Sequence, residues 1–324
     1  MPEEFKLRLR DISPKKHICV SQQFTPEYLL ELFALAAEME KNQNLYSEIL
    51  KNKIICLLFY EPSTRTRLSF ESAANRLGAK CLVSENAAQF SSAVKGETIE
   101  DTMEMINNYA DFVVVRHPED DVAYKIINST KIPYINAGTG KTQHPTQSLL
   151  DVYTIYQNFQ RLDNLKICLC GDLLRGRTVD SLVYLLSKFK NNKFYFVSPE
   201  NSRIKEDLKI HLNELQKINN LEFVELDNLI NVLPDIDILY MTRIQKERFD
   251  NPDEYELAKG KFILNLQNVS TMKEQAIILH PLPRIDEIAK EVDADPRAKY
   301  FQQAKNGVYI RMALLKILND NTEF

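Results

Sequence analysis

Short runs of apolar residues alternate with stretches of amphipathic pattern along most of the 324-residue chain. Many of the runs are apolar at consecutive positions, which is typical of strands that are buried on both faces of a sheet. We predict strands over the ranges Lys53–Phe59, Phe112–Arg116, Tyr134–Asn136, Lys166–Cys170, Lys193–Val197, Asp237–Met241, Phe262–Leu266 and Ile277–Leu279.

The stretches between these strands place apolar residues three or four positions apart, as on one face of a helix. We predict helices over Leu68–Leu77, Ile99–Tyr109, Gln147–Phe159, Val179–Phe189 and Ile204–Lys217. Near the start, Thr25-Pro26-Glu27 combines an N-cap, a first-turn proline and an acidic first turn. The apolar stretch Val308–Leu318 predicts a last helix that needs a groove to bury it.

The regular alternation of strands and helices predicts an α/β protein with doubly wound parallel sheets. The Gln147–Phe159 helix follows a polar segment and is a plausible connection between two α/β halves. Polar residues in such sheets become informative where strands end, because ligands bind outside the carboxyl ends of the strands.

Composition narrows the class of function. The formal net charge of -4 argues against non-specific nucleic-acid binding, so any anion site must be a local cluster of basic residues. No apolar run is long enough to span a membrane, and the first ten residues lack the apolar core of a signal peptide. Without a second Cys or His pair to complete a zinc pattern, we expect reduced cysteines, no metal and a cytoplasmic location. The five cysteines are Cys19, Cys56, Cys81, Cys168 and Cys170.

The segment Glu61-Pro-Ser-Thr-Arg-Thr-Arg67 lies between a predicted strand and a predicted helix. The free N–H groups and dipole of a helix N-terminus favour an anion there, and Ser63, Thr64, Arg65 and Thr66 add donors and charge. A capped helix start with surface arginines is the alternative. Two arginines that alternate with two threonines exceed what capping requires, so we favour a phosphate cradle.

Three other polar clusters follow predicted strands or precede predicted helices. They are Arg116-His117, His144-Pro-Thr-Gln147 and His280-Pro-Leu-Pro-Arg284. A single histidine is more often structural than catalytic, but two His-Pro motifs at such junctions favour a site. The prolines of the last cluster fix an irregular backbone whose carbonyls can accept hydrogen bonds.

A second anion site is indicated in the later half of the chain. The segment from Gly171 to Thr178 resembles a Walker A loop, but Arg177 stands where that motif requires lysine. Arg177 and Arg243, with Lys95 as a further candidate, instead suit a dicarboxylate, which arginine binds through two parallel hydrogen bonds. Nothing in the sequence resembles a covalent nucleophile with its base, a metal cluster or a dinucleotide-binding glycine loop.

In this order, the motifs resemble those of the aspartate carbamoyltransferase catalytic chains, over nearly the whole sequence. Ornithine carbamoyltransferases share the motifs Ser63-Thr-Arg-Thr-Arg67 and His144-Pro-Thr-Gln147. However, Pro281 replaces the cysteine of their His-Cys-Leu-Pro segment, and Arg243-Ile-Gln245 is similar to the aspartate enzymes. The resemblance therefore implies transfer of the carbamoyl group of carbamoyl phosphate to L-aspartate, without a cofactor. Ornithine or another amine as acceptor, and a non-catalytic scaffold subunit, are the rival hypotheses.

The resemblance also implies the domain organisation. Residues 1–145 would bind carbamoyl phosphate and would be completed by the C-terminal helix, about 304–324, which packs back on this domain. Residues 146–303 would bind aspartate.

Individual roles follow from the resemblance as well. Phosphate would be held by Ser63, Thr64, Arg65 and Thr66. The carbonyl oxygen would be surrounded by Thr66, Arg116 and His144. The carbamoyl amide would be received by Gln147 and by the backbone of Pro281 and Leu282, and Pro283 would also bind carbamoyl phosphate. Aspartate would be bound by Lys95, Arg177, Arg243 and Gln245. The residues with expected catalytic roles are Arg65, Thr66, Lys95, Arg116 and His144.

Ser91 and Lys95 match residues that enter the active site of a neighbouring subunit in this family, so the resemblance implies a homotrimer with shared sites. Val94 replaces a basic residue that some relatives carry before this lysine. Glu61 and Arg248 match positions that form domain-closing ion pairs in relatives. The sequence leaves open whether a separate regulatory chain is a further partner.

Overall fold

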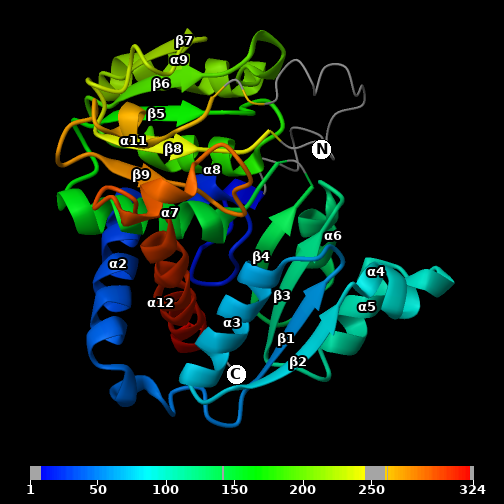
Figure 1. Cartoon of the computed structure of the whole chain (residues 1–324). Coiled ribbons are helices and arrows are strands. Elements are labelled where there is room, and N and C mark those ends of the chain that lie inside the picture. Colours follow the sequence, from blue (N-terminus) through cyan, green and yellow to red (C-terminus); the bar gives the residue numbers. More distant parts are fainter. Residues whose placement is uncertain (1–8, 141, 245–259, 261, 322–324) are drawn as a thin grey trace. The chain divides into compact units, whose positions relative to one another are not determined.

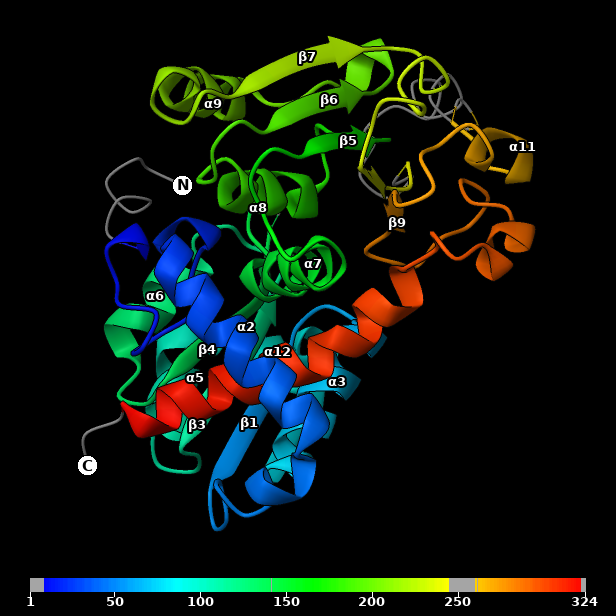
Figure 2. The same ribbon diagram turned by 90° about the vertical axis from the view of Figure 1, so that its left-hand side faces the viewer.

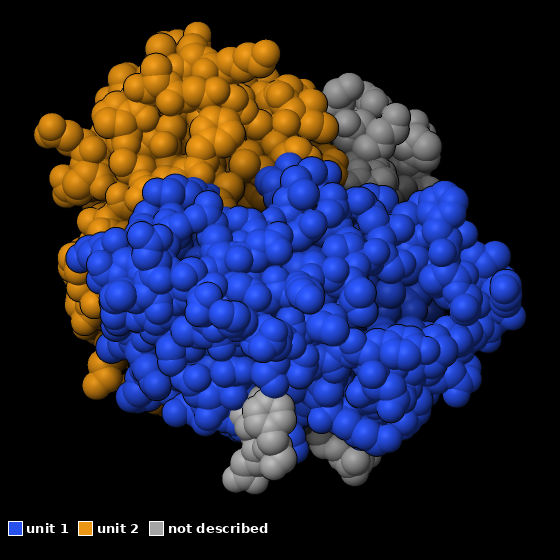
Figure 3. Space-filling model, turned by 90° about the horizontal axis from the view of Figure 1, so that it is seen from below, with its two compact units in different colours: residues 1–150, 305–324 blue, residues 151–304 orange. Residues whose placement is uncertain are grey.

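The computed structural model describes residues 9–140, 142–244, 260 and 262–321. Its contacts divide the chain into two compact units, which Figure 3 colours separately: residues 1–150 with 305–324 form unit 1, and residues 151–304 form unit 2. The chain passes between the units within helix α7 (Pro145–Phe159) and again within helix α12 (Tyr300–Asp320). The prediction of two parallel-sheet domains is confirmed.

Unit 1 is built on a four-stranded sheet in which every pair of neighbouring strands is parallel. The strand order is β2-β1-β3-β4. The strands are β1 (Ile54–Phe59), β2 (Lys80–Glu85), β3 (Phe112–His117) and β4 (Tyr134–Thr139). Because the strands are parallel, the chain leaves all four at the same edge of the sheet, where the cradle, Arg116 and the segment before His144 follow.

Helices cover both faces of this sheet (Figures 1 and 2). On one face lie α5 (Ile99–Ile106) and α6 (Val122–Ser129), which share a buried apolar cluster with alternate residues of β1 and β3. On the other face lie α2 (Pro26–Lys41), α3 (Thr64–Arg76) and α12. The short α4 (Ala87–Phe90) follows β2.

The last helix is tied into unit 1 by a buried arginine, as predicted for the C-terminal helix. Arg311 of α12 donates to Thr146 Oγ1 of α7 over 3.3 Å, and its guanidinium carbon lies 4.8 Å from the ring centre of Phe70 on α3. The arginine thereby connects the helix that follows the cradle to the helix that follows His144.

Unit 2 contains a five-stranded parallel sheet with the order β7-β6-β5-β8-β9. Its strands are β5 (Lys166–Cys170), β6 (Lys193–Val197), β7 (Glu222–Leu226), β8 (Ile238–Met241) and β9 (Ile277–Leu279). Its helices are α8 (Arg177–Leu186), α9 (Glu206–Asn219) and α11 (Leu266–Val269). Cys168 and Cys170 lie in one buried cluster on a single face of the sheet, as their spacing of two predicts.

Two strands are absent from the prediction, and one predicted strand is wrong. The missed strands β2 and β7 each form one edge of their sheet, and their residues are exposed or half-buried, unlike those of the buried edge strands β4 and β9. Phe262–Leu266 is not a strand. Leu264 forms one isolated bridge to Ile288, and the Asn265 side chain then caps α11 by accepting from the Asn268 N–H.

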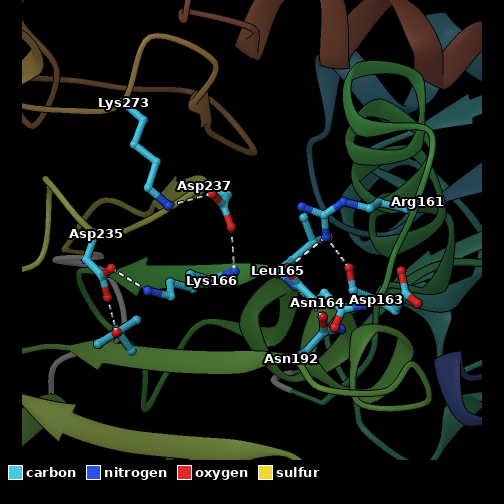
Figure 4. A network of polar contacts seen from close by, with 10 residues as sticks. Arg161, Asp163, Asn164, Leu165, Lys166, Asn192, Asp235, Asp237 and Lys273 are labelled. Carbon is cyan, nitrogen blue, oxygen red and sulfur yellow. Dashed lines mark hydrogen bonds and ion pairs between the residues drawn. The ribbon is translucent and has the colours of Figure 1, made fainter.

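The amino edge of the unit 2 sheet is held by a polar network (Figure 4). Asp237 accepts from the Lys166 N–H over 2.9 Å and from Lys273 Nζ over 2.7 Å, while Lys166 Nζ pairs with Asp235. Nearby, Asn192 accepts from the Leu165 N–H over 2.9 Å. These contacts fix the starts of the strands, at the edge opposite to the one where ligands bind in such folds.

Among the described residues, no helix is long and apolar enough to cross a membrane. Within the same residues, no three His, Cys, Asp or Glu side chains are grouped so that they could hold a metal ion. The absence of a metal and of a cofactor stays a prediction.

His17 makes the stability of unit 1 dependent on pH. Burial, with a smaller contribution from Lys16, lowers the pKa of His17 to about 4, and its Nδ1 accepts from the Tyr134 N–H over 3.1 Å. The folded state therefore favours the neutral ring, and its stabilisation is complete above pH 6.5 and is lost as the pH falls to 4. We expect a loss of about 3 kcal/mol across this window in urea titrations. His17→Asn, whose amide oxygen can accept the same N–H, should flatten the dependence; an unchanged slope would contradict it.

Candidate active site

The cradle follows β1 at the carboxyl edge of the unit 1 sheet. Ser63 is the N-cap of α3, but its side chain makes no capping hydrogen bond; only its carbonyl is used, by the Arg67 N–H over 3.0 Å. Thr66 is buried, whereas Thr64 and Arg65 are exposed. Because the Ser63 hydroxyl does not cap the helix, this observation favours the phosphate cradle over the alternative of a capped helix start.

The second arginine of the cradle has a different role from the first. Arg67 forms ion pairs with Glu71 one helical turn later, over 2.9 Å, and with Glu85 at the end of β2, over 3.1 Å. Arg67 therefore anchors α3 to the edge strand. Arg65, two positions earlier, has an exposed side chain.

Arg116 lies beside the cradle because β1 and β3 pair with Phe59 opposite Arg116. The Tyr60 N–H donates to the Arg116 carbonyl over 2.8 Å, and Arg116 Nε lies 3.3 Å from a carboxylate oxygen of Glu61. Glu61, which resembles a domain-closing residue of relatives, is thus paired within unit 1. His117 stacks edge-on against Tyr60, and burial lowers its pKa.

His144 lies at the start of α7, downstream of β4. Its side chain is buried, and its carbonyl accepts from the backbone N–H groups of Gln147 and Ser148 over 3.0 and 3.2 Å. The preceding Gln143 is also buried and accepts from the Ser21 N–H over 3.1 Å. The Gln147 side chain is half-buried. The cradle, Arg116 and His144 therefore lie at or after the carboxyl ends of β1, β3 and β4 in one sheet.

In unit 2, the loop between β5 and α8 has the strand–loop–helix form of a nucleotide cradle but not its chemistry. Asp172 is fully buried inside it and accepts from the Arg175 N–H over 3.1 Å. A buried carboxylate opposes a bound phosphate, which argues against the Walker A resemblance. Arg177, the first residue of α8, is buried.

Gly171 begins this loop at a position that a larger residue would not fit. Its φ is +125°, and an added Cβ would lie 2.1 Å from the carbonyl oxygen of Thr242. The chain leaving β5 is therefore in close contact with the chain leaving β8. Arg243 follows Thr242 directly and is half-buried.

A hollow of about 220 Å³ opens beside Arg243. Gly171, Thr242 and Arg243 line one part of it, and Ile285, Asp286 and Glu287 line another. Arg177 is not among its lining residues. Gln245 and Arg248 lie outside the described residues.

The segment after β9 offers hydrogen-bond acceptors only. Pro281 and Pro283 have no N–H, and the Leu282 N–H donates to His280 Nδ1 over 2.7 Å. With Nδ1 used as acceptor, the ring carries its proton on Nε2, which lies 2.7 Å from a carboxylate oxygen of Glu287. His280 is thus structural, and Glu287 is a residue of this loop that the sequence did not indicate. Carbonyls without competing donors suit an –NH2 group.

Ser91 and Lys95 lie on an exposed segment of unit 1, around α4 and the 3-10 helix Ser92–Lys95. Ser91 Oγ accepts from the Ala93 N–H over 3.2 Å and donates to the Ala87 carbonyl over 2.6 Å. Lys95 is exposed and makes no hydrogen bond or ion pair with any other residue that the structure describes.

Comparison with known proteins gives matches along the chain. A family model for the carbamoyl-P binding domain of aspartate/ornithine carbamoyltransferase matches residues 16–157, and one for the Asp/Orn binding domain matches residues 163–318. The chloroplastic aspartate carbamoyltransferase of Arabidopsis thaliana is 53% identical over 300 residues, covering 92% of this chain and 76% of that protein.

The chain belongs to the aspartate carbamoyltransferase family. The catalytic subunit of the Alkaliphilus metalliredigens enzyme is 49% identical over 302 residues, covering 93% of this chain and 96% of that one. The family resemblance inferred from the motifs is therefore confirmed, as is the enzyme class.

Solved structures of aspartate carbamoyltransferases have the same fold. The catalytic subunit from M. jannaschii is 45% identical, with a TM-score of 0.86 over 95% of this chain and 99% of that one. The Trypanosoma cruzi enzyme in complex with carbamoyl phosphate and aspartate is 34% identical, with a TM-score of 0.88 over 96% of this chain and 98% of that one.

Proposed function

We propose that the chain transfers the carbamoyl group of carbamoyl phosphate to the amino group of L-aspartate, which yields N-carbamoyl-L-aspartate and phosphate, a step of pyrimidine biosynthesis. The observation that carries the proposal is the register of β1 and β3, which pairs Phe59, the last residue of the strand that leads to the cradle, with Arg116. An anion cradle next to a further cation suits carbamoyl phosphate, which combines a phosphate with a polarised carbonyl. The family supports the choice of aspartate.

The phosphate and the carbamoyl group of carbamoyl phosphate would each be bound by side chains or carbonyls of complementary charge or hydrogen-bonding character. Ser63, Thr64, Arg65 and Thr66 would bind the phosphate oxygens. Thr66, Arg116 and His144 would surround the carbonyl oxygen. Gln147 and the carbonyls of the segment Pro281-Leu282-Pro283 would accept from the –NH2 group. The acceptor-only character of this segment supports that last assignment.

The aspartate carboxylates would be bound by Arg177, Arg243, Gln245 and Lys95. Arginine suits this role because its planar guanidinium binds a carboxylate through two hydrogen bonds. The position of Arg243 beside an open hollow supports its assignment. Arg177 is supported by its position at the first turn of α8 and by the family resemblance.

The neutral amine of aspartate would attack the carbamoyl carbon, and negative charge would grow on the carbonyl oxygen. Arg116, His144 and Thr66 would stabilise that charge as an oxyanion hole does. Collapse of the intermediate breaks the bond to phosphate, whose oxygens can take the amine proton. Catalysis would then rest on positioning and electrostatics and need no dedicated protein base.

The functional unit would be a homotrimer in which Ser91 and Lys95 complete the site of a neighbouring subunit. Unit 1 exposes apolar side chains on the edge strand β2 and on the segment that follows it, which supports an interface there. These side chains are Leu82, Val83, Phe90 and Val94. Relatives named as catalytic subunits leave a separate regulatory chain open as a partner.

A cytoplasmic location is the remaining part of the proposal. All five cysteines are free, and four of them are buried, as expected of a protein that folds where thiols stay reduced.

The proposed reaction is tested by supplying the purified protein with carbamoyl phosphate and either L-aspartate or L-ornithine. We expect carbamoyl aspartate and stoichiometric phosphate with aspartate, and turnover with ornithine lower by at least about 1000-fold, because arginines repel its cationic tail. Colorimetric assays of the ureido product and of phosphate measure the rate with each acceptor and the stoichiometry of the two products. Turnover of ornithine without turnover of aspartate would contradict the choice of acceptor.

A further inference from the structure

A buried carboxylate in unit 2 connects two sets of residues that we assign to substrate binding. One set is proposed to bind the carbamoyl amide, and the other is proposed to bind the aspartate carboxylates. Asp151 of α7 is fully buried. One of its oxygens accepts from the Tyr240 hydroxyl over 2.9 Å, and the other accepts from Gln303 Nε2 over 2.6 Å. Both donors are buried as well, so each hydrogen bond is formed away from water and is costly to lose.

On one side, this hydrogen-bonded connection reaches the segment Pro281-Leu282-Pro283 after β9, whose carbonyls are proposed to accept hydrogen bonds from the substrate (the carbonyl segment). Gln303 Oε1 of α12 accepts from the His280 backbone N–H over 2.9 Å. The orientation of the Gln303 amide is therefore fixed. The opposite orientation would place its oxygen next to the Asp151 carboxylate and its –NH2 group next to the His280 N–H, and neither pair can form a hydrogen bond. His280 in turn holds the Leu282 N–H and pairs with Glu287.

On the other side, the connection reaches the arginines. Tyr240 lies on β8, three residues before Arg243, and the side chain of Thr178, the residue after Arg177, lies near its hydroxyl and lowers the pKa that burial raises. One carboxylate thus joins the start of α8 and the end of β8 to the start of the loop after β9.

We propose that Asp151 and Gln303 are positioning residues, which hold the carbonyl segment Pro281-Leu282 in register with the arginine-bearing loops. This inference rests on the proposed function, because it assigns Pro281 and Leu282 to the carbamoyl amide. Neither residue touches substrate. Each acts through hydrogen bonds that fix the backbone on which the substrate-binding atoms lie.

The pair can be tested by exchanging its two functional groups. Asp151→Asn leaves only one acceptor oxygen, so either Gln303 Nε2 or the Tyr240 hydroxyl loses its acceptor. Gln303→Glu sets two carboxylates against each other. In the double variant, the new amide donates to the new carboxylate, which still accepts from the His280 N–H, while the oxygen of the new amide accepts from Tyr240. The exchange restores these three hydrogen bonds with the same number of heavy atoms and the same charge.

We expect each single variant to lower kcat/KM for carbamoyl phosphate about 10- to 100-fold, and the double variant to return to within about fivefold of the parent. The inhibition constant for inorganic phosphate should stay unchanged, because phosphate requires only the cradle of unit 1. A purely structural defect would not separate the two ligands in this way.

Asp237→Asn is the matched control, since Asp237 is a largely buried carboxylate with two donors at the opposite edge of the same sheet. It should lower Tm but leave kcat/KM per folded enzyme unchanged. If Asp151→Asn fails to fold, Tyr240→Phe removes one of the same hydrogen bonds without reversing a donor, and it should raise KM for aspartate.

The outcomes separate the two claims. If the parent is active and the Asp151→Asn and Gln303→Glu variants lose only thermal stability, as the Asp237→Asn control does, the positioning role is overturned while the proposed function stands. Single variants that lose activity without recovery in a folded double variant would overturn it too. A parent that forms no carbamoyl aspartate would overturn the proposed function and, with it, the basis of this inference.

Discussion

Replacing Arg65 with alanine is expected to lower kcat/KM for carbamoyl phosphate by at least about 1000-fold, because the cradle loses an exposed cation and a charge-assisted contact to phosphate. The side chain is exposed, so the fold should be unaffected. Steady-state kinetics and thermal unfolding of the purified variant measure the two effects separately.

Arg67→Ala provides the control on the same helix. Arg67 is bound to Glu71 and Glu85, so its loss should lower Tm while kcat/KM stays within about tenfold of the parent. If Arg65→Ala keeps full activity, the cradle assignment is wrong. If Arg67→Ala is the inactive variant, the two arginines have been assigned the wrong way round.

Mixing two inactive variants is expected to restore activity if the sites are shared between subunits. Lys95→Ala should inactivate the enzyme by removing a cation that acts in the neighbouring site. In random mixed trimers of Arg65→Ala and Lys95→Ala, about one site in four would combine an intact cradle with an intact lysine. Activity should therefore rise from near zero to roughly a quarter of the parent value after joint refolding.

Refolding each variant alone is the control, and mass spectrometry can verify that mixed trimers form. Confirmed mixed trimers without recovery would count against shared sites. Val94→Ala, at the neighbouring exposed position, keeps both the cradle and Lys95 and should be active by itself. Mixed with Arg65→Ala, it should leave about one site in two active, because every chain then carries the lysine and only the cradle is missing from half of the sites.

The sequence predicted the most completely buried strands best. β5, β6 and β9 have the predicted bounds, because strands buried on both faces leave continuous apolar runs. The edge strands β2 and β7 were missed for the opposite reason: half of their environment is solvent, and their polar residues resemble those of loops. Leu264 is as buried as a strand residue, yet it makes only one bridge, which no periodicity could reveal.

In the candidate site, residue type identified the clusters but not the partners of each residue. Arg65 and Arg67 look alike in sequence, and only the distances to Glu71 and Glu85 distinguish the anchor from the candidate ligand. The His280-Pro motif favoured a site, but only the structure shows that both ring nitrogens of His280 are used within its own loop, by Leu282 and Glu287. Asp151 and Gln303 are 152 residues apart, and nothing local links them.

The two crossings of the chain between its units have a consequence for biosynthesis. All of unit 2 is contiguous, whereas unit 1 is interrupted and needs residues 305–324 to be complete. During translation, which proceeds from the N-terminus, the ribosome has released every residue of unit 2 before the groove of unit 1 receives Arg311 and its neighbours on α12. The domain that begins first is thus the last to be finished, and the apolar surface that α12 covers stays exposed on the nascent chain until then.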